Sequence, residues 1–107
     1  MKQLTEEWLK EHEASDKIVE WFEKQEDKSP LAIYNQLMKE KRCSWARWLI
    51  IKAKLSVRYQ DWYSNGKKLR DCTYKDGELD GRCQLWYDNG QKWQDCTFKD
   101  GIRVEKG

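Results

Sequence analysis

Apolar residues recur every three or four positions through the first half of the chain, a spacing that places them on one face of a helix. Four such groups occur between Leu4 and Lys54, each preceded by a residue with a hydroxyl side chain. Such residues begin helices because the hydroxyl accepts a hydrogen bond from a free N–H group of the first turn. The four residues are Thr5, Ser15, Ser29 and Ser44. Pro30 strengthens the third start. The pattern predicts about four helices over residues 1–54.

The hydrophobic period changes after Leu55, and the second half of the chain contains an internal repeat. Residues 62–66 (Trp-Tyr-Ser-Asn-Gly) return as residues 86–90 (Trp-Tyr-Asp-Asn-Gly), and residues 71–77 return as residues 95–101, both with an offset of 24 residues. A unit this short holds one hairpin, and neighbouring units bury apolar surface that a single unit cannot bury. The repeat therefore predicts two stacked β-hairpins.

Each hairpin has an Asn-Gly pair between two strand-like runs. A two-residue type I′ turn needs positive φ at both positions, which Asn and Gly supply most readily. Loops of two residues would pair Trp62 with Leu69 and Trp86 with Trp93. Alternation along the strands would then gather these four residues into an apolar stripe on one face of the sheet. We expect the stripe to anchor a binding partner if the helices leave that face open.

These elements together predict an α+β protein, in which an N-terminal helical layer is followed by a C-terminal antiparallel β-meander. Residues 102–105 would supply a fifth, terminal strand. A chain of 107 residues has the size of one domain, so the helical region (1–54) and the repeats (55–107) are expected to form one cooperative unit. The chain has no uncharged apolar run of membrane-spanning length and no secretory signal near its start, so we expect a cytoplasmic protein that does not enter a membrane.

The formal net charge of +2 hides two blocks of opposite sign. Residues 6–27 hold nine acids and three bases, whereas residues 39–58 hold seven bases and one acid. Such blocks are either solvated helix faces that attract each other or surfaces for a partner. As a partner surface, Lys41, Arg42 and Arg47 would steer an acidic protein by long-range attraction. Because residues 39–58, which we name the basic strip, also contain aromatic residues, single-stranded nucleic acid is an alternative ligand.

The chain has four cysteines, separated by gaps of 29, 11 and 13 residues that do not follow the paired spacing of zinc sites. We therefore expect no metal, and no motif calls for a cofactor. The predicted register places Tyr59 opposite Cys72 and Cys83 opposite Cys96, where Cα atoms approach to about 4.5 Å, within the range of a disulfide. We expect buried thiols at these positions, with a Cys83–Cys96 disulfide as the alternative.

The hairpin units resemble MORN-type repeats, in particular the bacterial YwqK-like antitoxin group. A unit of that group reads approximately as aromatic-Tyr-x-Asn-Gly, a short strand, Gly-x-Tyr/Phe-Lys-Asp-Gly and Leu-x-Gly. Here residues 62–66 and 74–81 carry the pattern, and residues 86–90 and 98–101 carry it again, over about half of the chain. Three cysteines replace the usual Gly or aromatic residue of the repeat: Cys72, Cys83 and Cys96.

The N-terminal half resembles a short helical region found at the front of some phage and bacterial proteins, often before pentapeptide repeats. Residues 8–12, Trp21 and residues 44–50 carry this second resemblance. The two resemblances together imply a protein of mobile elements or of defence systems. They imply a regulatory role, and neither carries a catalytic motif.

The sequence thus predicts a non-catalytic module that binds another protein. The chain's single histidine, His12, belongs to a charged helix far from any cysteine, so we expect no catalytic residue. The expected partner is a toxin or a nuclease of a defence system, neutralised stoichiometrically as antitoxins or anti-CRISPR proteins do. One alternative is a nucleic-acid-binding regulator that uses the basic strip 39–58, and another is a structural module that self-assembles through an open sheet edge. We expect a monomer or a weak homodimer.

Overall fold

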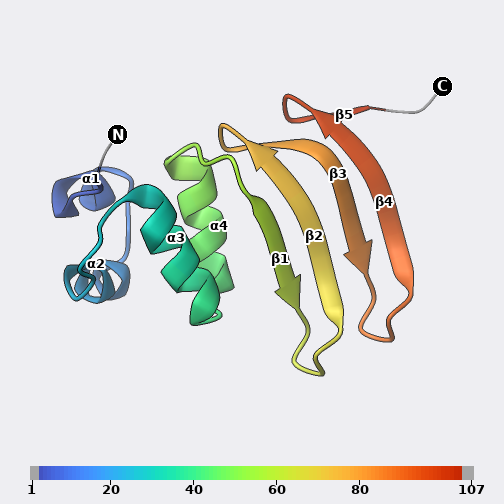
Figure 1. Cartoon of the computed structure of the whole chain (residues 1–107), viewed down its shortest axis with the longest axis horizontal. Helices are drawn as coiled ribbons and strands as arrows, with labels where there is room; N and C mark the ends of the chain where they lie inside the picture. Colours follow the sequence, from blue (N-terminus) through green and yellow to red (C-terminus); the bar gives the residue numbers. More distant parts are fainter. Residues whose placement is uncertain (1–2, 105–107) are drawn as a thin grey trace. The chain divides into compact units, whose positions relative to one another are not determined.

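A computed structural model describes residues 3–104, which form four helices followed by a five-stranded antiparallel sheet (Figure 1). The predicted α+β class is therefore confirmed, with the helices before the strands. The chain divides into two compact units, Met1–Ala53 and Lys54–Gly107, which we name the helical unit and the sheet unit. Within residues 3–104, no helix has the length and apolar character needed to cross a lipid bilayer.

The first three helices begin at the predicted signals. The helices are α1 (Glu6–Glu11), α2 (Asp16–Glu23), α3 (Pro30–Lys39) and α4 (Cys43–Lys52). The Thr5 hydroxyl accepts from the Trp8 N–H group at 3.0 Å, and the Ser15 hydroxyl accepts from the Ile18 N–H group at 3.4 Å. Ser29 is the N-cap of α3, directly before its first residue. Hydroxyl caps therefore mark the first two starts, as the sequence predicts, whereas Ser29 makes no side-chain capping bond and α3 begins with Pro30 at its first position.

Helix α4 begins at Cys43, not after a cap at Ser44 as predicted, and its N-cap is Arg42. The reason is the way in which α3 ends. The Arg42 N–H group donates to the Leu37 carbonyl at 2.8 Å, and Lys41 adopts a positive φ of 59°. This is a Schellman ending, which reverses the chain within two residues. Helix α4 therefore starts at once, without a hydroxyl cap.

The core of the helical unit forms where the apolar faces of its helices meet. Leu9 of α1, Phe22 of α2, Leu37 of α3, and Leu49 and Ile50 of α4 are all buried. Figure 1 shows α3 and α4 side by side, and each contributes its buried face to this core. The helical period read from the sequence therefore corresponds to the buried faces.

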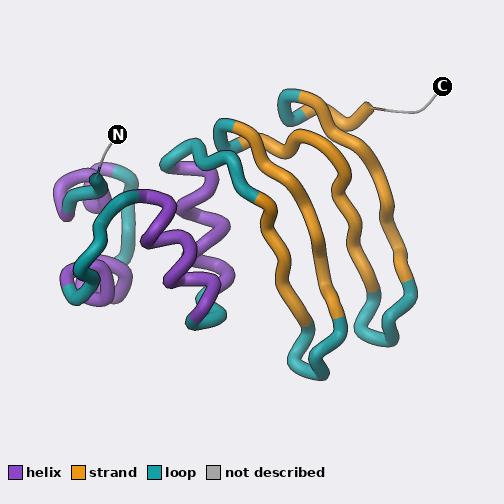
Figure 2. The backbone as a smooth tube through the Cα atoms, viewed as in Figure 1, coloured by secondary structure: helices purple, strands orange, loops and turns teal. Residues whose placement is uncertain are grey.

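The sheet unit is a meander in which each strand pairs with the next strand in the chain (Figure 2). The strands are β1 (Arg58–Trp62), β2 (Lys68–Lys75), β3 (Glu78–Trp86), β4 (Lys92–Lys99) and β5 (Ile102–Val104). Tyr59 lies opposite Cys72 and Cys83 lies opposite Cys96, so the predicted register is confirmed in the middle of both hairpins. Residue 105, predicted as the end of the last strand, lies outside the described residues.

The predicted register is wrong near the hairpin loops. Trp62 lies opposite Lys68, not opposite Leu69. Leu69 is instead the extra residue of a β-bulge, because the pairing shifts by one residue between Trp62 and its neighbour in β1. The second hairpin shows the same shift, with Trp86 opposite Lys92 and Trp93 in the bulge.

The shift arises because each loop has three residues and not two. The Tyr63 N–H group donates to the Lys67 carbonyl at 2.8 Å, which leaves residues 64–66 as the loop. The Gly66 N–H group closes a turn onto the Tyr63 carbonyl at 2.9 Å, and Gly66 has a φ of +86°. A three-residue hairpin loop needs this positive φ at its last residue. The longer loop moves the pairing next to it by one residue, and the unpaired Leu69 restores the predicted register further along the strands. Gly90 has the equivalent role in the second loop, with a φ of +91°.

We expect Gly66→Ala to lower the free energy of unfolding by about 1 kcal/mol, because a Cβ is unfavourable at positive φ. A Cβ added at Gly66 would meet no heavy atom within 4 Å, so the cost would come from the backbone alone. Gly66→Asn should cost less, since Asn tolerates the left-handed region. Urea unfolding of the wild type and both variants checks this expectation. Equal losses for Ala and Asn would contradict it.

Candidate functional site

The loop end of the sheet gathers aromatic side chains from β1, β3 and β4. Trp62 and Trp86 are the last residues of β1 and β3, Tyr63 and Tyr87 follow them, and Trp93 is near the start of β4. Trp62, Tyr87 and Trp93 are 51%, 52% and 48% exposed, respectively. The ring centres of Tyr87 and Trp93 lie 6.1 Å apart. We name these five residues the aromatic end.

Hydrogen bonds hold the two hairpin loops of the aromatic end to each other. The Tyr63 hydroxyl donates to the Trp86 carbonyl at 2.6 Å, and the Asn65 side-chain amide donates to the Asp88 carbonyl at 2.8 Å. Both bonds run from the first repeat to the second. They restrain the loops that carry the exposed aromatic residues, so this end of the sheet is ordered by the chain itself.

A cluster of charged side chains links β1 to β2. The Asp71 carboxylate is held by the Arg58 guanidinium through two parallel contacts, Nε to Oδ1 at 2.9 Å and Nη2 to Oδ2 at 2.6 Å. The Gln60 amide donates to Oδ2 at 3.2 Å, and the Lys68 ammonium contacts the same oxygen at 3.3 Å. Bidentate pairs of this kind fix the geometry as well as the charge. We name this cluster the first clamp.

The second repeat contains a copy of the clamp between β3 and β4. Arg82 contacts Asp95 at 3.0 Å and 2.7 Å, and Lys92 contacts Asp95 at 3.2 Å. Each residue lies 24 positions after its counterpart in the first clamp. The sequence predictions missed both clamps, although the same 24-residue offset relates the charged positions as well as the aromatic ones.

The clamps keep two carboxylates ionised well into the acid range. The Arg58 guanidinium, with smaller contributions from Lys68 and Gln60, lowers the pKa of Asp71 to about 2 against the opposing effect of burial. Arg82 and then Lys92 likewise lower the pKa of Asp95 below its usual range. Both acids are therefore charged partners of the bases at neutral pH.

Trp86 lies between two lysines from the neighbouring strands. The Nζ atoms of Lys68 and Lys92 are each 5.7 Å from its ring centre, close enough for cation–π attraction. The predicted pairing of Trp86 with Trp93 is therefore replaced by contacts of Trp86 with lysines and of Trp93 with Tyr87. Trp62, Tyr87 and Trp93 are the exposed members of the aromatic end.

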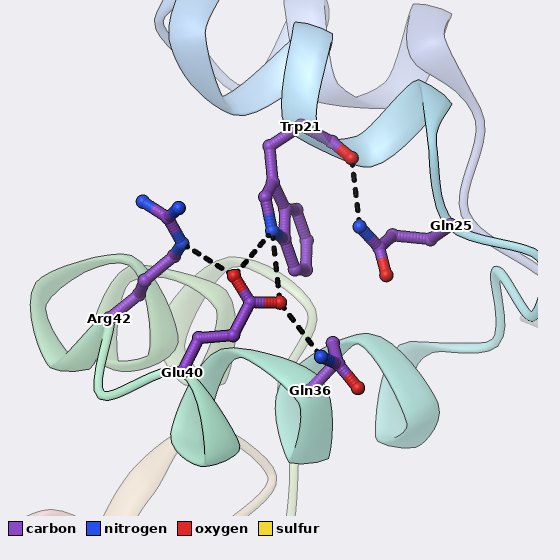
Figure 3. A network of polar contacts seen from close by, with 5 residues as sticks. All are labelled: Trp21, Gln25, Gln36, Glu40 and Arg42. Carbon is purple, nitrogen blue, oxygen red and sulfur yellow. Dashed lines mark hydrogen bonds and ion pairs between the residues drawn. The ribbon is translucent and has the colours of Figure 1, made fainter.

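In the helical unit, Arg42 belongs to an internal network around Glu40 (Figure 3). The Glu40 carboxylate accepts from Arg42 Nε at 2.9 Å, from Gln36 Nε2 at 2.8 Å and from Trp21 Nε1 at 3.0 Å. Hydrogen bonds from Gln36, Arg42 and Trp21 lower the pKa of Glu40 to about 2. The Arg42 guanidinium also lies over the Trp45 ring, 4.9 Å from its centre. Arg42 is therefore engaged within the chain.

The other two predicted steering residues differ in exposure. Lys41 is exposed in the turn between α3 and α4. Arg47 is partly buried, and its Nε atom is buried without a hydrogen-bond partner in the described part of the chain. Of the three bases, Lys41 is the one that is exposed and outside the Glu40 network.

The structure corrects the cysteine predictions. A disulfide joins Cys72 to Cys83, whose Cα atoms are 4.2 Å apart, so the expectation of thiols at both positions is wrong. The alternative Cys83–Cys96 bond is also not the one formed, because Cys96 is free and buried. Cys83 lies opposite Cys72 as well as Cys96. The predicted register covered pairing within each hairpin but not the pairing of β2 with β3, so it missed this contact.

No protein-family model, curated protein or solved structure matches the chain. The site is therefore interpreted from its own geometry.

We expect Asp71→Asn to lower the free energy of unfolding by about 1–2 kcal/mol at neutral pH, because it weakens hydrogen bonds made to charged partners. Asp95→Asn is the matched control in the second clamp. Its loss should be smaller, since the Asp95 side chain is 34% exposed and that of Asp71 only 10%. Urea unfolding of the three proteins at one pH measures the difference. Equal losses would show that burial does not strengthen the first clamp.

The same variants test the pH dependence of stability. An unfolded Asp titrates near pH 3.9, whereas Arg58 lowers the folded pKa of Asp71 to about 2. The stability contributed by ionised Asp71 is therefore complete above about pH 4 and is lost as the pH falls toward 2. Wild-type stability should fall more steeply over this interval than that of Asp71→Asn. Parallel curves would contradict the assignment.

Proposed function

We propose that this chain is a non-catalytic protein-binding module that neutralises a protein partner stoichiometrically by covering part of its surface. The proposed binding surface is the aromatic end of the sheet. The observation that carries the proposal is that Trp62, Tyr87 and Trp93 are each about half-exposed next to hydrogen-bonded loops, with the Tyr87 and Trp93 rings in contact. Trp and Tyr are enriched among the few residues that supply most of the energy of protein interfaces.

The order of the aromatic end supports binding of a folded partner. A loop that becomes ordered only on binding lowers the affinity, because its conformational entropy is lost at that moment. The bonds from Tyr63 to Trp86 and from Asn65 to Asp88 restrain these loops in the unbound chain. The aromatic side chains are thus presented at little further entropic cost.

A positive charge beside the aromatic end favours an acidic partner. Lys67 lies in the first hairpin next to its loop, whereas Lys68 and Lys92, which flank Trp86, are paired with the clamp carboxylates Asp71 and Asp95. Positive charge around an aromatic contact raises the rate of encounter with an acidic surface more than it raises the final affinity. Salt should therefore slow association without abolishing the complex.

The resemblance of the hairpins to MORN-type repeats of the antitoxin group supports an inhibitory role. Under this proposal the partner is a toxin or a nuclease of a defence system, and the chain acts by blocking its surface without chemistry. Such partners act in the cytoplasm, where we propose that the chain works.

Binding of nucleic acid through the basic strip 39–58 is less well supported. Two of its seven bases, Arg42 and Arg58, are held by carboxylates of the same chain. Phosphate binding would replace these pairs and would weaken steeply with salt because counterions are released. The experiment below separates this alternative from protein binding.

The test is affinity capture from a lysate of the source cells, with and without nuclease, followed by mass spectrometry. Wild type is compared with Trp62→Ala/Trp93→Ala. The control is Leu31→Ala/Ile51→Ala, which removes two apolar side chains of similar exposure, 54% and 56%, from the helical unit. We expect a protein that survives nuclease and is retained by the wild type and the control but not by the aromatic variant.

Binding of the purified partner then gives the magnitude. Loss of one anchoring Trp should weaken the affinity about 30-fold, the equivalent of about 2 kcal/mol. Circular dichroism confirms that each variant is folded. Unchanged binding by the folded aromatic variant would exclude the aromatic end as the binding surface. Retention that disappears with nuclease would favour the nucleic-acid alternative.

A further inference from the structure

Three cysteines form a row across the three central strands of the sheet. Cys72 of β2, Cys83 of β3 and Cys96 of β4 occupy successive register positions, with Cys83 in the middle. Their exposed fractions are 4%, 5% and 8%. The disulfide joins Cys72 to Cys83, and Cys96 remains a free thiol on the other side of Cys83. The chain therefore holds a thiol and a disulfide as direct neighbours.

We propose that this row is an internal thiol–disulfide exchange site in which the disulfide moves between two positions. The Cys96 thiolate attacks the Cys83 sulfur, the bond between Cys83 and Cys72 breaks, and its electron pair leaves with the Cys72 sulfur. The product is a Cys83–Cys96 disulfide and a Cys72 thiolate. The proton lost by Cys96 is balanced by the one that Cys72 gains, and no outside oxidant or reductant is consumed.

The contacts of Cys96 hold its sulfur beside β3. The Gln94 amide donates to Cys96 Sγ at 3.2 Å. The Cys96 thiol contacts the Cys83 carbonyl at 3.8 Å, so its sulfur lies against β3. Cys96 and Cys72 lie on the two strands that flank β3, so the attacking and the leaving cysteine come from opposite neighbours of Cys83.

The same register makes Cys83 obligatory in either disulfide. Cys72 and Cys96 are two strands apart, a separation of roughly 9–10 Å between strand axes. Cysteines whose Cα atoms are more than about 7 Å apart cannot be bridged without backbone movement. A direct Cys72–Cys96 bond is therefore excluded in the folded sheet, and burial of all three residues restricts exchange with external thiols.

Exchange would change which parts of the sheet are covalently joined. The Cys72–Cys83 bond links the first hairpin to the second, whereas a Cys83–Cys96 bond closes the second hairpin on itself. The two forms have the same composition and mass but differ in whether the repeats are cross-linked. This inference is independent of the proposed binding function.

Peptide mapping of the intact folded chain tests the proposal. Cleavage after Lys and Arg places the three cysteines in separate peptides, residues 71–75, 83–92 and 93–99. Protein carrying one disulfide is incubated at neutral pH without oxidant, quenched in acid, alkylated and digested. We expect the wild type to show peptide 83–92 joined to 71–75 in some molecules and to 93–99 in others.

Single substitutions separate the two positions. When refolded with oxidised glutathione, Cys96→Ser should form the Cys72–Cys83 bond, Cys72→Ser should form the Cys83–Cys96 bond, and Cys83→Ser should form neither. Cys43→Ser, which removes the free thiol of the helical unit, should leave the wild-type mixture unchanged. A Cys72–Cys96 bond in the folded chain would overturn the proposal. So would a wild type that keeps one bond alone after incubation, a result that does not depend on how any variant folds.

Discussion

Backbone hydrogen bonds between β2 and its two neighbours set the register on which the sheet unit depends. Asp71 and Cys72 are adjacent in the sequence, so their side chains emerge on opposite faces of β2. On one face the register brings Asp71 to Arg58, and on the other it brings Cys72 to Cys83. A slip of one residue would reverse both faces together. The ionic clamp therefore stabilises the alignment of β2 with β1, and the covalent bond stabilises its alignment with β3, from the two sides of the same strand.

Much of the fold could be predicted because periodicity and capping are local properties. The 24-residue repeat indicated the hairpins, and Thr5 and Ser15 cap helices as expected. The loop ends could not be predicted from Asn-Gly alone, since loops of two and three residues both use this pair and differ by one position of register. The pairing of β2 with β3 starts at the two-residue turn of Asp76 and Gly77, which both have positive φ. The register then shifts between Cys72 and Tyr74, so the Cys72–Cys83 bond could not be predicted from that turn. Of the four residues of the predicted stripe, Trp62 and Trp93 are exposed, and the lysines around Trp86 were not predicted.

In the helical unit, Glu40 shows why formal charge is a poor guide to a surface. Its carboxylate joins Trp21 of α2, Gln36 of α3 and Arg42 of the following turn, elements that are separated along the chain. A carboxylate that accepts from a guanidinium also reduces the field that this guanidinium exerts on the surroundings. The basic strip is therefore weaker as an electrostatic surface than its seven bases suggest.

Strand β5 begins 24 positions after the first residue of β3. It therefore lies where a further copy of β3 would begin. Each hairpin brings its own clamp and its own Asn-Gly loop. Tyr63 and Asn65 of the first hairpin bond to Trp86 and Asp88 of the second, in each case one position before the donor's repeat equivalent. Duplication of one 24-residue segment within the gene would thus lengthen the sheet by two strands and add aromatic residues at its loop end, while every existing strand pair keeps its register. The length of the surface offered to a partner can therefore change, by evolution or by design, in increments of one hairpin.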